Sequence, residues 1–435
     1  MNVDGGAGGN GGTGTVINTD GAHGDAGKAF DIDSSVNFQK TPTTLTNGSS
    51  TISQSQVTNH TTVNISGSGV VAQLPPTDAS GTYLISSTYD WITFADAVNT
   101  GTTSFSGKTV KLTADISGVT TMVGTGDYPF AGTFDGDGHT LTVNISSSGA
   151  AALFGKVGNA TIKKLHVAGS VKTTMTDGAD HTGGLISRAG GSVTIENVRF
   201  SATVTGLTYY SGFIGNGNRD DVSIGTTIKM TGCVFDGQLT ENVAGETQYA
   251  GGFIGWGGTS TYIVISYSLF AGTCTIATNG SGAHNFHPVG YYSSYDNGEN
   301  TITFTPNLSH VYYTVAPSAQ TTVNFGAALS YHEKQAYTIS TSDANVTTLA
   351  IDDGLDDNEF PASGLNFYIN GGIEYGSTFY AGDGDKVKLA LAHKDAAVGQ
   401  HSTGYAVTGG GTLDDNTSNT PTLTMTAANQ TISAV

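Results

Sequence analysis

The chain has 435 residues, of which 62 are glycine and only 12% are charged, and its formal net charge is −19. So long a chain is expected to form more than one structural unit, and its low charge with abundant Gly, Ser, Thr and Tyr is typical of all-β proteins. The chain has 16 Lys and Arg residues against 35 Asp and Glu residues, and the basic residues form no cluster in the sequence. This argues against nucleic acid as a partner. No apolar run approaches the length needed for membrane insertion.

Residues 1–82 are rich in Gly, Ser and Thr, and we expect them to form a β-structured N-terminal region. Their glycine run matches the spacing G-x-G-x-x-G by chance, because no strand precedes it and no helix follows. Asn47 and Gly48 lie between short polar β segments and predict a hairpin turn. Residues 1–4 lack the basic and apolar parts of a signal peptide, and we interpret the chain as a segment of a longer exported protein rather than a cytoplasmic one.

Residues 88–98 carry the one convincing helical pattern. The apolar residues Trp91, Phe94 and Val98 recur at helical spacing, and Thr88 is placed to cap the start. An amphipathic helix ahead of a long β region can cover the open edge of a β stack. We therefore expect an N-terminal capping helix with Trp91 and Phe94 facing the first coil.

A glycine and apolar motif recurs after this helix at intervals of 32, 28 and 40 residues. Each copy is followed by a second strand of alternating polarity. Such inexact periods without helices predict stacked coils, with the differences in length placed in loops. We expect one residue of each copy to occupy the same buried position: Leu153, Ile186, Ile214 and Ile254.

Residues 89–98, 105–116 and 130–141 together resemble the opening of bacterial surface proteins with GLUG-type repeats, and the Gly-Phe-Ile-Gly segments resemble the repeats themselves. The likeness covers roughly residues 83–315. It implies a right-handed parallel β-helix, which we assign to residues 83–333, in an exported, adhesin-like bacterial protein. The resemblance transfers no catalytic residues.

The character of the sequence changes for residues 334–435, where we expect a small β-sandwich or β-grasp-like module. Its final segment, residues 423–434, resembles the closing strands of small β modules that occur in tandem on bacterial surface proteins. That resemblance implies a spacer or stalk within a longer surface protein.

Aromatic residues outside the repeat positions are the strongest indication of a ligand. Rigid, flat side chains with a polar tip at the corners of coils suit sugar rings, although packing of the coil ends is the alternative interpretation. The candidate ligand-binding residues are Tyr209, Tyr210, Trp256, Tyr262, Tyr291, Tyr292 and Tyr295.

Two acidic segments of the sequence have the residue types of a metal site. Residues 134–139 are better explained as a tight turn between strands, because Asp and Gly favour a positive φ. Residues 352–359 are the better Ca²⁺ candidate, because hard cations bind clustered carboxylates, but the spacing differs from an EF-hand and a solvated acidic loop is the alternative. The candidate ligands are Asp353, Asp356, Asp357 and Glu359. No other cofactor is expected.

The cysteines and the few arginines and carboxylates decide whether a disulfide or an active site is expected. Cys233 and Cys274 are interpreted as free thiols rather than a disulfide. Arg199 alternates with apolar neighbours in a strand and is expected to point to solvent, while Asp236 and Glu246 are candidate carboxylates for an active site. Glycosidases need such carboxylates in pairs.

We therefore expect a non-catalytic, secreted or cell-surface adhesin-like protein that recognises glycans or host and matrix surfaces. The alternative is a polysaccharide-degrading β-helix enzyme, either a lyase or a glycoside hydrolase.

Overall fold

The structure is a computed structural model of the whole chain, and it divides into two compact units, Met1–Gln73 and Leu74–Val435. Besides isolated strand segments, it describes residues 74–178, 181–217, 226–243, 248–257, 261–275, 306–314, 334–351, 378–394 and 404–435. Within these residues, no helix has the length and hydrophobicity needed to span a bilayer.

The described part of the first unit consists of short strands. β1 (Phe30–Ile32) pairs in parallel with β5 (Val57–Asn59), and β2 (Val36–Phe38) pairs in parallel with β6 (Val63–Ile65). β3 (Thr46–Asn47) and β4 (Ser50–Thr51) form the hairpin predicted from Asn47 and Gly48.

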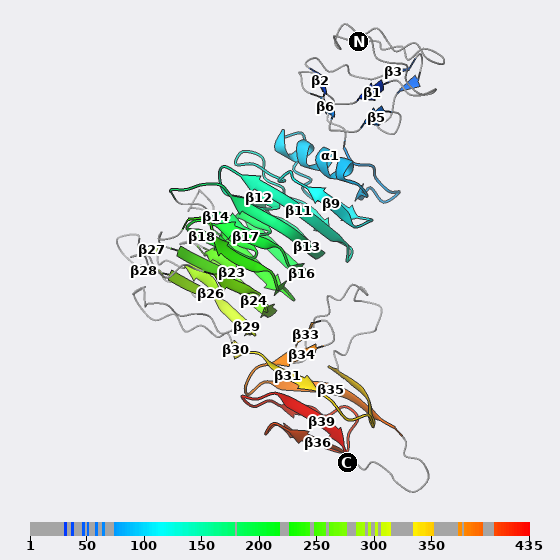
Figure 1. Cartoon of the computed structure of the whole chain (residues 1–435), viewed down its shortest axis with the longest axis vertical. Helices are drawn as coiled ribbons and strands as arrows, with labels where there is room; N and C mark the ends of the chain where they lie inside the picture. Colours follow the sequence, from blue (N-terminus) through cyan, green and yellow to red (C-terminus); the bar gives the residue numbers. More distant parts are fainter. Residues whose placement is uncertain are drawn as a thin grey trace. The chain divides into compact units, whose positions relative to one another are not determined.

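Two large parallel sheets make up most of the second unit, so the chain is an all-β protein with a parallel β-helix (Figure 1). The strands of the 15-stranded sheet are β7 (Tyr83–Ile85), β8 (Thr109–Leu112), β9 (Ile116–Val119), β10 (Thr133–Asp135), β11 (Thr140–Ser147), β13 (Thr161–Thr173), β16 (Ser192–Phe200), β17 (Thr203–Gly206), β20 (Thr226–Thr231), β21 (Val234–Phe235), β22 (Gln238–Glu241), β24 (Thr261–Phe270), β25 (Thr273–Thr275), β29 (Asn307–Tyr313) and β30 (Lys334–Gln335). The strands of the 7-stranded sheet are β12 (Phe154–Gly158), β14 (His181–Gly183), β15 (Ile186–Gly190), β18 (Tyr209–Ser211), β19 (Ile214–Asn216), β23 (Gln248–Trp256) and β26 (His284–Tyr291). A separate antiparallel pair joins β27 (Tyr295–Asp296) and β28 (Thr301–Ile302).

The interior of the coils is built from ladders of apolar residues at equal positions. Ile162, Ile195, Met230 and Ile265 are register partners on four successive coils, and each is buried. A second ladder stacks the ring of Phe235 between those of Phe200 and Phe270, with centroids 6.2 and 5.3 Å apart. Because every coil places the same kind of side chain at the same depth, the core is continuous along the stack.

The ladder predicted from the repeats is correct at three of its four positions. Ile186, Ile214 and Ile254 are register partners and are buried, but the first member is Phe154 rather than Leu153. The placement of Leu153 was wrong by one residue. Leu153 is also buried, so hydrophobicity alone could not distinguish the two neighbours.

A bend at one position of each coil sets which side chains face outward on the 15-stranded sheet. Lys164, Asn197, Gly232, Tyr267 and His310 have φ between 44° and 63°, the left-handed region. The bend lets Ile162 and Leu165, three residues apart, both point inward. Residues just after the bend, such as His166, therefore alternate outward again.

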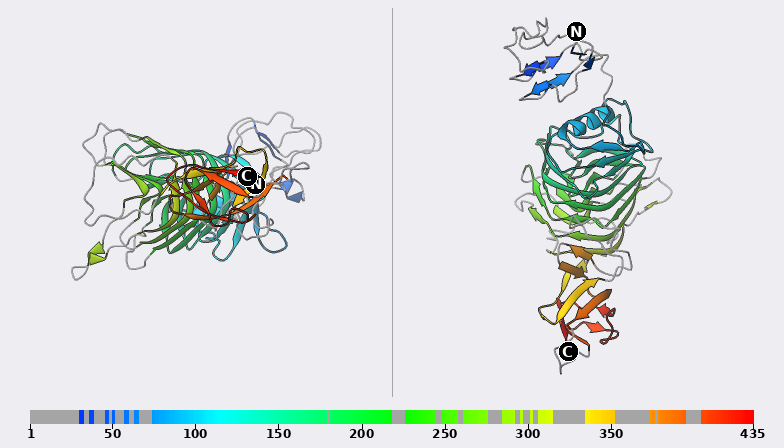
Figure 2. Two further views of the ribbon diagram at one scale, coloured as in Figure 1. Left: turned by 90° about the horizontal axis from the view of Figure 1, so that it is seen from below. Right: turned by 90° about the vertical axis from the view of Figure 1, so that its right-hand side faces the viewer.

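The helix α1 (Thr88–Asn99) covers the first coils, as predicted, and Figure 2 shows it lying across the end of the stack. Its N-cap is Ser87, one residue before the expected Thr88, and the Ser87 hydroxyl accepts a hydrogen bond from the Asp90 amide. Trp91 and Phe94 are fully buried. Their rings contact the aromatic interior, with Trp91 5.8 Å and Phe94 5.9 Å from Phe134 between centroids.

The two cysteines are free thiols, as predicted. Cys233 is fully buried in the core of the coils, and Cys274 is a register partner of Leu239 at half-buried depth.

The C-terminal residues form two sheets around a separate apolar core that includes Ile339, Leu389 and Leu423. Nearly all of their strand pairs are antiparallel, and β31 with β39 is a parallel pair. The strands are β31 (Tyr337–Ser340), β32 (Val346–Ile351), β33 (Ile373–Tyr375), β34 (Thr378–Ala381), β35 (Lys386–His393), β36 (Tyr405–Thr408), β37 (Thr412–Leu413), β38 (Thr422–Thr424) and β39 (Gln430–Ala434). We call this part the C-terminal module.

Trp91→Ala should lower the free energy of unfolding by about 3–5 kcal/mol, because it removes a fully buried indole and leaves a cavity between α1 and the first coils. Urea denaturation measures the change, and Tyr128→Ala is the control, since Tyr128 is 47% exposed. Equal stability of the two variants would show that α1 does not seal the stack.

Candidate functional site

The predicted ligand-binding aromatics are distributed over both sheets. Tyr209 and Trp256 are half-buried on the 7-stranded sheet, and Tyr262 is 51% exposed on the 15-stranded sheet. Tyr210 is fully buried among the core residues, so its assignment as a surface contact is corrected. Side chains alternate along a strand, and Tyr210 therefore points inward while its neighbour Tyr209 points outward.

The remaining predicted aromatics are described only in part. The backbone of Tyr291 is the register partner of Trp256 on the next coil, and Tyr295 lies in β27. Their side chains, and the whole of Tyr292, lie outside the described residues.

Three rings on the 7-stranded sheet are in mutual contact, and we call them the aromatic cluster: His181, Tyr209 and Trp256. The His181 ring lies 5.2 Å from that of Tyr209 and 5.1 Å from that of Trp256, centroid to centroid, and the planes are nearly parallel. Tyr209 and Trp256 complete the contact at 5.5 Å. The register pairs His181 with Tyr209 on the adjacent coil.

Polar residues share the ladder of Trp256. Arg188, Asn216 and Trp256 are register partners on three successive coils. Arg188 is half-buried and Asn216 is 4% exposed. The ladder of Trp256 therefore combines an aromatic ring with hydrogen-bonding groups, the combination that carbohydrate sites use.

The acidic turn at residues 134–139 serves structure, as predicted. Asp137 and Gly138 have φ of 48° and 83°. Asp137 pairs with Lys111 at 2.9 Å, and Asp135 pairs with Lys163 at 3.4 Å. These carboxylates are thus engaged by lysines.

The calcium prediction is not tested by the structure. Its residues, Asp353, Asp356, Asp357 and Glu359, lie outside the described part of the chain. Among the residues that are described, no group of three or more His, Cys, Asp or Glu side chains is arranged to hold a metal ion.

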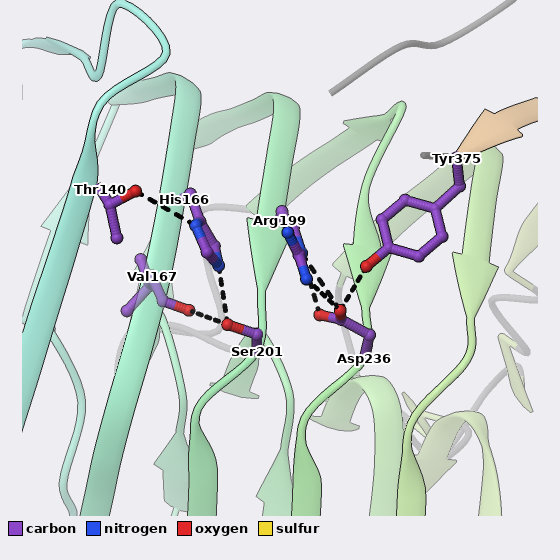
Figure 3. Close-up of polar contacts among 7 residues, drawn as sticks. All are labelled: Thr140, His166, Val167, Arg199, Ser201, Asp236 and Tyr375. Atoms are coloured by element: carbon purple, nitrogen blue, oxygen red, sulfur yellow. Dashed lines mark hydrogen bonds and ion pairs between the residues drawn. The ribbon is translucent and has the colours of Figure 1, made fainter. Parts of the chain in front are cut away.

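Arg199 faces outward but is not simply solvated, which corrects the expectation from its strand. Its guanidinium donates two hydrogen bonds to one Asp236 oxygen, from Nε at 3.1 Å and from Nη2 at 2.6 Å (Figure 3). The Tyr375 hydroxyl donates to the same carboxylate, and the guanidinium lies 5.4 Å from the Tyr375 ring centroid. We call Arg199, Asp236 and Tyr375 the polar cluster. Glu246, the other predicted carboxylate, lies outside the described residues.

A histidine and a serine lie beside the polar cluster on the same sheet. Nε2 of His166 is 2.7 Å from Oγ of Ser201, and Nδ1 is 3.2 Å from Oγ1 of Thr140 (Figure 3). The Ser201 hydroxyl also reaches the carbonyl oxygen of Val167 at 3.3 Å. A serine within reach of an imidazole is the first requirement of nucleophilic catalysis, but the group beyond the imidazole is a hydroxyl rather than a carboxylate.

Both outward contacts are diagonal contacts between successive coils. Arg199 is the register partner of His166. On the next coil, His166 contacts Ser201, the residue after Phe200, and Arg199 contacts Asp236, the residue after Phe235. Sequence reasoning missed them because the partners are 37 and 35 residues apart. These contacts can be predicted from the sequence only when the register between successive coils is known.

No protein-family model matches the sequence, and no curated protein matches it significantly. A comparison of structures finds a likeness to a crystal structure described as a "putative immunoglobulin A1 protease" from Bacteroides ovatus. The two chains are 17% identical with a TM-score of 0.32, and the match covers 56% of this chain and 88% of that one. So remote a likeness carries no argument about activity.

His166 gives the folded protein a pH dependence of predictable sign. Burial of the imidazole, together with the positive charge of Arg199, lowers its pKa below the ordinary value of 6.5. The unfolded chain protonates His166 more readily than the folded chain does. The contribution of His166 to stability is therefore fully present above about pH 6.5 and is lost as the pH falls below that value. Unfolding free energies measured at about pH 7.5 and pH 5 should therefore differ less in His166→Gln than in the wild type. Equal losses in both proteins would show that His166 is not buried as described.

Proposed function

We propose that the chain is a non-catalytic, adhesin-like protein of the cell surface or secreted fraction that binds glycans through the aromatic cluster. The observation that carries this proposal is the mutual contact of the His181, Tyr209 and Trp256 rings on one sheet, where Tyr209 and Trp256 are half-buried and His181 is 8% exposed. The resemblance of the opening and the repeats to GLUG-repeat bacterial surface proteins supports the same function.

The physical basis is the match between flat rings and sugars. An aromatic face offers apolar contact to the C–H face of a pyranose, while its polar edge accepts or donates hydrogen bonds. Asn216 is the register partner of Trp256 and Arg188 is the register partner of Asn216, so both add hydrogen-bonding groups to the same ladder. Because paired strands hold these residues, little side-chain freedom is lost when a ligand binds, and that favours affinity.

Trp256→Ala and Tyr209→Ala should each weaken the binding of a glycan by at least about tenfold, which corresponds to about 1.4 kcal/mol. A glycan array identifies the ligand, and calorimetry with the isolated oligosaccharide measures the affinity. Tyr262→Ala is the matched control, because Tyr262 is an exposed aromatic on the other sheet. Unchanged affinity in both cluster variants, or loss only in Tyr262→Ala, would overturn the assignment of the site.

Polysaccharide cleavage by a lyase or glycoside hydrolase is the second candidate function, favoured by the polar cluster. Asp236 supplies a carboxylate on the outer face beside a guanidinium and a phenol. Its oxygens are engaged by Arg199 and Tyr375, so a substrate would have to displace one of them. If Asp236→Asn abolishes turnover of a polysaccharide while Trp256→Ala leaves binding intact, the enzyme replaces the adhesin.

A further inference from the structure

One outward-facing ladder of the 15-stranded sheet changes its chemistry along the stack. Successive register pairs align six residues on neighbouring coils, in the order Thr140, His166, Arg199, Val234, Leu269 and Tyr312. The first three are polar and half-buried, as expected for the outside of a sheet. The last three are two aliphatic residues and a tyrosine.

The second half of the ladder is covered. Val234, Leu269 and Tyr312 are each 0% exposed, and they form a small apolar cluster separate from the interior of the coils. Tyr375 of β33 and Tyr380 of β34, both from the C-terminal module, pack against this cluster. Outward apolar residues would otherwise leave a hydrophobic strip in water, which marks an interaction surface.

Two hydrogen bonds beside the apolar cluster join the coils to the C-terminal module, one made by Tyr312 and one made by Tyr375. The Tyr312 hydroxyl donates to Oδ2 of Asp385 at 2.6 Å, and the same oxygen accepts from the Gly382 amide at 2.8 Å. At the polar end, Tyr375 donates to Asp236 of the polar cluster. Burial and the acceptor Asp385 together raise the pKa of Tyr312, which keeps its hydroxyl protonated as the donor.

The chain itself favours the C-terminal module as the occupant of this surface. β30 is the last strand of the 15-stranded sheet and ends at Gln335, and β31 of the module begins at Tyr337. Only Ala336 separates them, and Ala336 packs on the same apolar cluster. So short a connection holds the module at a high effective concentration next to the surface.

We propose that Val234, Leu269 and Tyr312 form a docking surface for the module of the same chain, which makes it a fixed second cap of the β-helix rather than a freely swivelling spacer. The polar cluster then orients the module at the edge of the interface. This inference is independent of the proposed glycan binding.

Distance measurement between two spin labels on the full chain tests the proposal. Labels at Lys172→Cys on β13 and Thr420→Cys on the module occupy exposed positions, in a Cys274→Ser background that leaves the fully buried Cys233 unlabelled. The docked module should give one narrow distance distribution. A broad distribution in this otherwise unaltered chain would overturn the proposal.

A double variant on the module side identifies the contacts responsible. Tyr375→Ala with Tyr380→Ala removes the covering rings without touching the module's own core, and the distribution should become broad. Tyr405→Phe is the control, because the Tyr405 hydroxyl bonds to Asn419 within the module. The distance distribution of this variant should stay narrow. Hydrogen exchange of β35 verifies that the module remains folded in both variants. A narrow distribution in the double variant would show that this surface does not hold the module.

Discussion

The parallel register between successive coils is the constraint on which the rest of the structure depends. Each strand of the stack pairs with the equivalent strand one coil away, so a residue and its register partner share one direction and one depth. Inside, this rule demands the same chemistry at every level, as in the ladder from Ile162 to Ile265. A polar residue at one level would lie between apolar neighbours without a partner, at considerable cost.

On the outside the same register allows each ladder to change from coil to coil. One such ladder runs from His166 and Arg199 to apolar residues that the module covers. The scaffold thus separates the two demands on the sequence. Stability comes from ladders that repeat, and specificity comes from ladders that vary.

Much of the architecture follows from patterns that are local in the sequence. The spacing of Trp91 and Phe94 identified the capping helix, and the recurring motifs identified the coils. The outward contacts were harder to predict, because the partner of Arg199 depends on the loop lengths between coils, which vary. Whether an aromatic residue faces in or out depends on the strand phase within each coil, and for that reason Tyr210 was misplaced and the contribution of His181 was missed.

The positive-φ bend explains why simple alternation misleads on the 15-stranded sheet. A strand that alternated without interruption would place Leu165 opposite to Ile162, yet both are buried. The left-handed residue Lys164 between them shifts the phase by one. Lysine, asparagine, glycine, tyrosine and histidine all occupy this position in different coils, and the sequence therefore carries no single residue type that marks it.

The register can be tested directly by disulfide formation between neighbouring coils. Lys163 and Glu196 are outward register partners, about 4.8 Å apart for paired strands, which is within the range that a disulfide bridges. Lys163→Cys with Glu196→Cys should oxidise readily, whereas Lys163→Cys with Thr194→Cys, displaced by two residues along the strand, should not. Crosslinking of the displaced pair in preference to the aligned pair would contradict the register, and with it the arrangement of every ladder described above.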